Sequence, residues 1–94
     1  MKIRDVEPNA TATLDYVTVV KKEAVREFEK FGKKGLVCNC TIKDASGEMQ
    51  LTLWNEDVNA VEEGEKIKIT DGWVKEWNGQ KQITPGRNGK IEKL

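Results

Sequence analysis

The sequence predicts a small all-β domain, and three observations support this fold class. Short segments alternate apolar and polar residues and are rich in Val, Ile, Thr and Trp, which favour strands. Turn signals at Ala45-Ser46-Gly47 and Asn78-Gly79 separate these segments in the manner of hairpins. The 94 residues are 37% hydrophobic, which is enough for one compact core. We therefore expect a single domain over residues 1–94, with residues 1–12 as a lead-in segment.

Five strands and one short helix are expected along the chain. The strands are expected at residues 14–22, 36–44, 49–54, 66–77 and 80–84, and residues 89–93 suit a short final strand. Asn55 is a suitable N-cap for a short helix near residues 56–62, because Glu56 and Asp57 favour a helix N-terminus. The charged stretch from Glu23 to Gly35 is ambiguous, and suits either a helical turn or a long loop that continues the first strand.

The two cysteines fall on one face of the expected strand at residues 36–44. Because side chains alternate along a strand, Cys38 and Cys40 share a face with Leu36 and Ile42. The opposite face then carries Val37, Asn39, Thr41 and Lys43. Two thiols alone do not form a zinc site, and the chain has no histidine. We expect buried, inert thiols and no metal or cofactor.

The three tryptophans stand in polar surroundings, which core filling does not explain. Trp54 shares the polar face of its strand with Gln50 and Thr52. Simple alternation would bury Trp73 beside Ile67 and Ile69, but glycine within a strand often marks a bulge. A bulge at Gly72 would turn Val74 inward and would turn Trp73, Lys75 and Trp77 outward. Flat aromatic faces beside lysines are typical of proteins that bind single-stranded nucleic acid.

Charge is unevenly distributed on a neutral chain. The 16 basic and 16 acidic residues give a net charge of zero, which argues against indiscriminate binding of polyanions. Residues 1–43 (9 basic, 6 acidic) and 72–94 (5 basic, 2 acidic) each carry +3, whereas residues 44–71 (2 basic, 8 acidic) carry −6. If the basic segments meet in space, one face is positive. The acidic run Glu62-Glu63-Gly64-Glu65 is expected to be a turn away from that face.

The order of the expected elements is that of the five-stranded Greek-key barrel called the OB-fold, with a short helix between the third and fourth strands. The stretches from Asp44 to Trp54 and from Val61 to Trp73 resemble two motifs of the archaeal single-stranded DNA-binding proteins and of the OB domains of replication protein A. The first is D-x-[ST]-G-x-[IVM]-x-[LV]-[TV]-[LV]-W, and the second is [IV]-x-x-G-[DE]-x-[IV]-x-I-x-x-[AG]-[WY]. The resemblance covers nearly the whole chain.

This resemblance implies sequence-tolerant binding of single-stranded DNA in replication, recombination or repair. In the family, bases stack on aromatic residues at positions that match Trp54, Trp73 and Trp77. Around them we expect lysines and one arginine to contact the backbone, and polar side chains to hydrogen-bond bases or phosphates. The candidate backbone contacts are Lys33, Lys34, Lys75, Lys81 and Arg87, and the candidate polar contacts are Asn39, Thr41 and Thr52.

Two other functions remain open. An RNA-binding OB module would use the same stacking, because stacking does not distinguish RNA from DNA, whereas contacts to the 2′-hydroxyl do. A protein-interaction domain of a replication protein A-like complex would use exposed tryptophans as anchors for a replication or repair protein. We do not expect an enzyme, because the sequence has no histidine and no Gly-rich phosphate loop. With no long apolar run and a polar N-terminus, we expect a cytoplasmic protein without a membrane segment.

Overall fold

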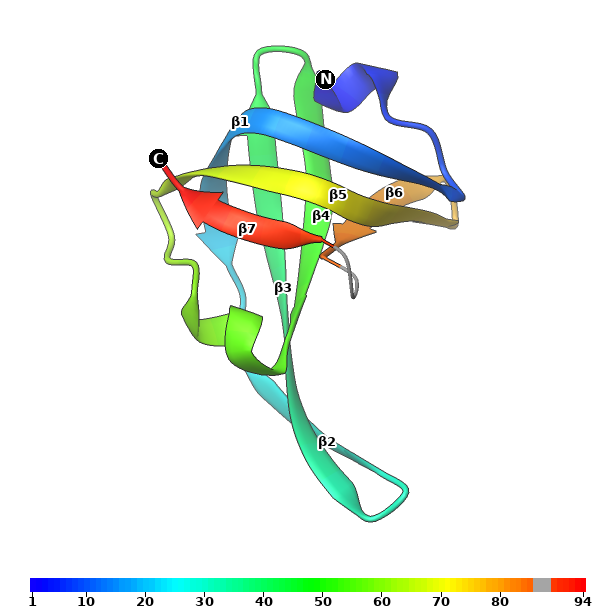
Figure 1. Ribbon diagram of the computed structural model, residues 1–94, viewed down its shortest axis with the longest axis vertical. Coiled ribbons are helices and arrows are strands. Elements are labelled where there is room, and N and C mark those ends of the chain that lie inside the picture. Colours follow the sequence, from blue (N-terminus) through cyan, green and yellow to red (C-terminus); the bar gives the residue numbers. More distant parts are fainter. Residues whose placement is uncertain (86–88) are drawn as a thin grey trace.

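The computed structural model describes residues 1–85 and 89–94, and most of these residues lie in strands (Figure 1). Its elements, in chain order, are η1 (Ile3–Asp5), β1 (Ala10–Lys22), β2 (Arg26–Lys30), β3 (Lys33–Asp44), β4 (Gly47–Trp54), η2 (Asn55–Asn59), β5 (Lys66–Trp77), β6 (Gln80–Thr84) and β7 (Lys90–Lys93).

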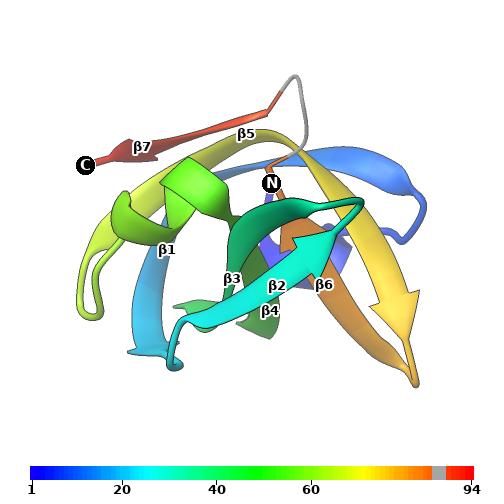
Figure 2. The same cartoon turned by 90° about the horizontal axis from the view of Figure 1, so that it is seen from below.

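Five of the strands close into a barrel. They pair in the order β1-β3-β4-β6-β5, and β5 pairs with β1 to complete the ring. The β4–β6 pair is parallel, and the other pairs of the ring are antiparallel. Seen from below, these strands curve around a common interior (Figure 2). The expected all-β OB-fold barrel is confirmed, and β7 adds the short final strand at the edge of β5.

The interior of the barrel is apolar. Its largest fully buried side chains come from every strand of the ring and from the connection after β4, and include Leu14, Val19, Ile42, Leu51, Val61, Ile69 and Ile83. Cys38 and Cys40 lie in the same cluster, on the inward face of β3 as alternation predicts. Burial of this surface is the main force that holds the barrel closed.

The N-terminal segment before β1 packs into the core. Ile3 and Val6 are buried in the core cluster, and β1 begins at Ala10 instead of Leu14. Asp44 anchors the segment, because its Oδ2 accepts a hydrogen bond from the Ile3 amide at 2.9 Å. Burial acts to raise the pKa of Asp44, but hydrogen bonds from Ser46, Ile3 and Gly47 outweigh it and lower that pKa.

The helix after β4 differs from the expected one. It is a 3₁₀-helix over Asn55–Asn59, not a helix over residues 56–62, and Asn55 is not its N-cap. Asn55 has a φ of 53°, and its Oδ1 accepts the Leu36 amide proton at 3.1 Å across the sheet. The tertiary hydrogen bond therefore uses the side chain that local capping rules assign to the helix.

The predicted bulge in β5 is present, and after it the alternation of inward and outward side chains is shifted by one residue. Ala12 pairs with Gly72 and Leu14 pairs with Ile69, so β5 has one more residue than β1 in this interval. Asp71 takes the positive φ, at 50°, beside Gly72. Ile69 and Val74 are therefore both buried, while Trp73 points outward as predicted.

The ambiguous stretch at residues 23–35 forms a strand, not a helical turn or a plain loop. β2 pairs with the first half of β3, and the two project from the barrel as a hairpin (Figure 1). We call residues 26–37 the arm. It extends along the longest axis of the molecule, whose dimensions are 40 × 27 × 24 Å.

Candidate nucleic-acid interface

Two of the tryptophans meet at one hollow on the outside of the barrel. Trp54 ends β4, Trp73 lies after the bulge of β5, and β6 runs between these strands. The hollow has a volume of about 80 Å³ and is lined by Thr52, Trp54, Trp73, Lys75, Gln82, Ile83 and Thr84. We call the outward side of β3, β4, β6 and the second half of β5 the tryptophan face.

Trp54 is supported from the arm. Trp54 is 43% exposed, and the Phe28 and Trp54 rings pack edge to face, with 5.5 Å between centroids and 85° between planes. Gly35 lies opposite Phe28 in the arm, and a Cβ at Gly35 would collide with the Phe28 ring. The absence of a side chain at Gly35 therefore makes room for the ring that supports Trp54.

Trp73 and Trp77 follow each other along β5 on the same face. Trp73 is 38% exposed and Trp77 is 67% exposed. Lys75 lies between them and is also exposed. Four residues of strand separate Trp73 from Trp77 by roughly 13 Å. The three indoles thus mark out a track across the tryptophan face, with Trp77 at the β5–β6 hairpin.

The polar side chains between the tryptophans are largely uncharged. Thr52 Oγ1 donates to Asn39 Oδ1 at 3.2 Å, which joins two of the predicted residues. Gln82 Nε2 donates to Gln50 Oε1 at 3.3 Å in the next row, and these two glutamines were not among the predicted site residues. Alternation along β4 already placed Gln50 beside Trp54, so the signal for it was present in the sequence.

Thr84 is a further residue that the sequence prediction missed. It pairs with Trp73 across β5 and β6 and lines the hollow between Trp54 and Trp73. Its hydroxyl is buried and has no hydrogen-bond partner among the residues that the structure describes. A buried hydroxyl without a partner is unfavourable, so Thr84 is a candidate to bond a ligand that enters the hollow.

The structure separates the predicted basic residues. Lys33 and Lys34 lie in β3, not in a loop, and neighbouring side chains in a strand point to opposite faces. Lys33 shares the face of Val37 and Asn39, whereas Lys34 points to the other side of the arm. Lys81 faces the same way as Ile83, away from the tryptophans, and its Nζ donates to the Val6 carbonyl. Arg87 lies outside the described residues.

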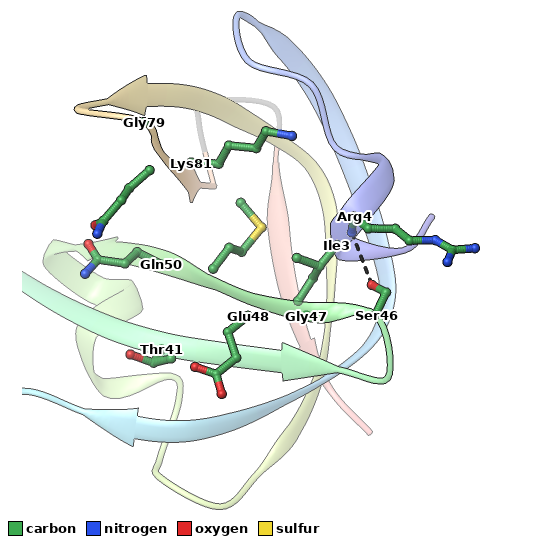
Figure 3. Close-up of a pocket in the computed structure, with 11 residues that line it drawn as sticks. Ile3, Arg4, Thr41, Ser46, Gly47, Glu48, Gln50, Gly79 and Lys81 are labelled. Carbon is green, nitrogen blue, oxygen red and sulfur yellow. Dashed lines mark hydrogen bonds between the residues drawn. The ribbon is translucent and has the colours of Figure 1, made fainter.

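A larger hollow of about 510 Å³ lies where η1, the β3–β4 hairpin and the β5–β6 hairpin approach one another (Figure 3). Thr41 and Gln50 reach it from the tryptophan face, and Lys81 lines it from β6. The Arg4 amide donates to Ser46 Oγ at 3.1 Å and ties η1 to its rim. Thr41 and Lys81 therefore belong to this hollow rather than to the one between Trp54 and Trp73.

The acidic run lies at the far end of β5 from Trp77. It leads from η2 into Lys66, and two of its carboxylates lie near lysines. Glu62 lies 3.7 Å from Lys22 Nζ, and Glu65 lies 3.4 Å from Lys93 Nζ. The predicted turn is confirmed, and its negative charge is distant from the β5–β6 hairpin.

The thiols are enclosed by the core. Burial, with the neighbouring Cys38, raises the pKa of Cys40 to about 12, so its thiol is protonated at neutral pH. Over residues 1–85 and 89–94, no group of three or more acidic or cysteine side chains is placed to hold a metal ion. No helix in the same part of the chain is long and apolar enough to cross a membrane.

Comparison with known proteins places the chain in a family. The family profile described as "OB-fold nucleic acid binding domain" matches residues 17–87, which include all three tryptophans. The chain belongs to this family. The resemblance of its motifs to archaeal single-stranded DNA-binding proteins and to replication protein A is also confirmed by relatives of both kinds.

Two curated relatives are archaeal. The single-stranded DNA binding protein Ssb of Saccharolobus solfataricus is 26% identical over 96% of this chain and 61% of its own length. Replication factor A of Methanothermobacter thermautotrophicus is 39% identical over 71% of this chain but only 8% of its own length. The chain therefore spans about three fifths of one relative and a small part of the other.

A solved structure with the same fold is the second OB-fold domain of replication protein A from Methanococcus maripaludis. It is 28% identical, covers 100% of this chain and 93% of that chain, and superposes with a TM-score of 0.81. The superposition covers the entire barrel, so the solved structure and the family profile both indicate an OB-fold.

Proposed function

We propose that this chain binds single-stranded DNA with little sequence preference and serves DNA replication, recombination or repair. The observation that carries the proposal is the hollow shared by Trp54 and Trp73, which brings two exposed indoles from different strands together. Relatives named for single-stranded DNA binding and for replication support the choice of ligand. We infer that residues 1–94 act as one OB-fold domain in this role.

Stacking on indole supplies the affinity in this mechanism. An unpaired base that leaves its neighbours loses stacking, and an exposed indole face restores roughly 1–3 kcal/mol for each base. Every base has a flat face, so Trp54, Trp73 and Trp77 would accept any sequence. In this proposal, base edges accept or donate hydrogen bonds to the glutamine, asparagine and threonine side chains of the tryptophan face, including the Thr84 hydroxyl, which has no partner within residues 1–85 and 89–94.

Basic residues at the margins of the track contact the phosphates in this proposal. Lys75 lies between Trp73 and Trp77, and Lys33 lies on the arm face that continues toward Trp54. Because binding releases counterions from the nucleic acid, the affinity is expected to fall as salt concentration rises. Lys81 is already bonded to the Val6 carbonyl, so we expect a smaller contribution from it.

Fluorescence titration of the intact chain tests the proposal. Thymidine oligonucleotides are expected to quench tryptophan fluorescence at low salt. The double substitution Trp54→Ala with Trp73→Ala is expected to raise the dissociation constant roughly 30-fold, equivalent to about 2 kcal/mol of lost stacking. Because two fluorophores are removed, the affinity of the variant is measured with a labelled oligonucleotide.

Tyr16→Ala provides the matched control. Tyr16 is a 54% exposed aromatic residue on β1, and Lys66 Nζ lies 5.6 Å from the centroid of its ring. The substitution therefore removes an exposed aromatic side chain beside a lysine at a different site. Unchanged affinity of the double tryptophan variant would contradict the proposal. Uridine oligonucleotides that bind more tightly than thymidine ones would assign the face to RNA. A concentration-dependent mass without oligonucleotide binding would assign it to a protein partner.

A further inference from the structure

Among the residues that the structure describes, the ring of the barrel has its shortest ladder of paired residues between β4 and β6. This ladder joins Gln50 to Gln82 and Leu51 to Ile83. The two strands are parallel, and parallel pairing is slightly less stable per residue than antiparallel pairing. We call this ladder the seam, and we expect the ring to need support beside it.

The seam divides the tryptophan face into two halves. Trp54 lies on β4, whereas Trp73 and Trp77 lie on β5, beyond β6. The hollow that Trp54 and Trp73 share therefore spans the seam. A change in the spacing of β4 and β6 alters the distance between these indoles, and a binding site tolerates only small changes of that kind.

The N-terminal segment crosses the seam at its open end. We call residues 3–9 the strap. The pairing of β4 with β6 ends at Gln50 and Gln82, and the hollow of about 510 Å³ opens there between the β3–β4 and β5–β6 hairpins (Figure 3). Ile3 and Arg4 of the strap line this hollow, and Ile3 is buried in the core cluster. The strap therefore lies where the pairing of the sheet stops.

Charged side chains from both hairpins fasten the strap. On one side, Asp44 Oδ2 accepts the Ile3 amide proton at 2.9 Å, while Asp44 Oδ1 accepts the Ser46 amide proton at 2.7 Å. On the other side, Lys81 Nζ donates to the Val6 carbonyl. Hydrogen bonds with an ionised partner are roughly twice as strong as neutral ones. The strap thus links the β3–β4 hairpin to β6 independently of the seam.

We propose that Asp44 and Lys81 are positioning residues, which fasten the strap across the seam and hold the two halves of the tryptophan face at the spacing that binding requires. This assignment rests on the proposed function of that face. Neither side chain contacts nucleic acid in this role. The sign of the Asp44 effect is therefore distinctive, because loss of a negative charge by itself favours the binding of a polyanion.

Asp44→Asn tests the fastening at the β3–β4 hairpin. Asn offers one acceptor oxygen where the Asp44 carboxylate uses two, so at least one of its hydrogen bonds is lost. The dissociation constant of a thymidine oligonucleotide of about 12 nucleotides, measured by tryptophan quenching, is expected to rise roughly threefold. Glu48→Gln is the matched control, since it removes one negative charge from an exposed side chain of the same hairpin. It is expected to leave binding unchanged or slightly tighter.

Lys81→Met tests the fastening on β6. It removes the donor to the Val6 carbonyl and is expected to raise the dissociation constant roughly threefold at every salt concentration. The slope of log Kd against log salt is expected to stay unchanged, whereas loss of a phosphate contact would reduce it by about one. Lys81→Arg retains a cationic donor and is expected to restore the affinity.

The same substitutions in a Trp54→Ala chain separate positioning from general destabilisation. One half of the track is then absent, so Asp44→Asn and Lys81→Met are expected to cause little further loss. Circular dichroism establishes which variants are folded at the assay temperature, and either fastening alone suffices for the test.

Equal losses with and without Trp54 would overturn the positioning role. Unchanged or tighter binding by Asp44→Asn, or a reduced salt slope for Lys81→Met, would also overturn it. In each of these cases the unmodified chain still binds, and the proposed function stands. If the unmodified chain shows no quenching at low salt, the proposed function itself fails, and the positioning role fails with it.

Discussion

The barrel has two hairpins with two-residue turns of the same backbone form, and they use opposite chemistry. The β5–β6 turn places Asn78 and Gly79 at φ values of 51° and 78°, which suits both residues. Glu76 and Lys81 pair across the same hairpin with opposite charges. The arm turn instead places Phe31 at positive φ, beside the like-charged pair Lys30 and Lys33. One hairpin follows the local rules of stability, and the other departs from them twice.

The two hairpins also differ in what supports them. The β5–β6 hairpin belongs to the closed ring, where a Cβ on Gly72 would lie 2.7 Å from Ile83 Cγ1 in the core. The arm projects beyond the ring, and its contacts with the rest of the molecule include the Phe28 ring on Trp54 and the hydrogen bond from the Leu36 amide to Asn55 Oδ1 (Figure 1). Local departures from stability rules are typical of functional sites, and the turn of the arm tolerates them because residues 30–33 are all exposed.

The largest expected effect is a loss of stability on adding a methyl group at a glycine that packs closely against its neighbours. Gly72→Ala is expected to destabilise the protein by roughly 1–3 kcal/mol, because the new methyl group overpacks Ile83. The midpoint temperature of thermal unfolding is then expected to fall by roughly 4–8 °C for each kcal/mol of stability lost. Gly35→Ala is expected to cost less, because the new methyl group meets the half-buried Phe28 ring and Asn55 Oδ1 rather than a side chain of the core. Equal losses for the two variants would show that the arm is as integral to the core as the β5–β6 hairpin.

An intermediate effect is expected from exchanging the turn chemistry. Asn78→Phe puts an aromatic residue at the positive φ of the β5–β6 turn and is expected to cost about 1 kcal/mol. Urea unfolding measures the change, with Asn78→Gly as the control that tolerates the same φ. An unchanged midpoint for Asn78→Phe would remove the strain argument for Phe31, since the two turns share their backbone form.

The smallest expected effect separates the two faces of the arm. Lys33→Glu replaces the like-charged pair with an opposite one, so a stability gain of roughly 0.2–1 kcal/mol is expected. It is also expected to weaken oligonucleotide binding and to reduce the salt dependence by about one phosphate contact. Lys34→Glu makes the same change of charge on the opposite face and is the control. Equal weakening by both variants would mean that only the overall charge of the arm matters.

The sequence predicted the outward positions of the tryptophans because facing along a strand depends only on alternation. Trp54 follows from that rule directly, and Trp73 follows once a bulge beside Gly72 is allowed. The same rule placed Cys38 and Cys40 in the core. Alternation could not show that Lys81 bonds the Val6 carbonyl, because that contact joins segments far apart in the chain.

Residues 23–35 and Asn55 show where local patterns are insufficient. The charged stretch has Phe28 and Phe31 at a spacing that suits a helical turn, but pairing with β3 makes it a strand. Asn55 has the chemistry of an N-cap, but the Leu36 amide claims its side chain across the sheet. In both places hydrogen bonds outside the expected helix, with the adjoining strand in one case and across to Leu36 in the other, outweigh a preference worth about 1 kcal/mol or less.

By itself, the sequence determined the all-β class, the family motifs and the face of the sheet on which each tryptophan lies. These features depend on composition and on a period of two, which a strand keeps in any tertiary setting. Only the tertiary structure decided that Trp54 and Trp73 share a hollow and that the arm extends their face toward Phe31. Those relations join residues that are far apart in the sequence, so alternation along one strand does not reveal them.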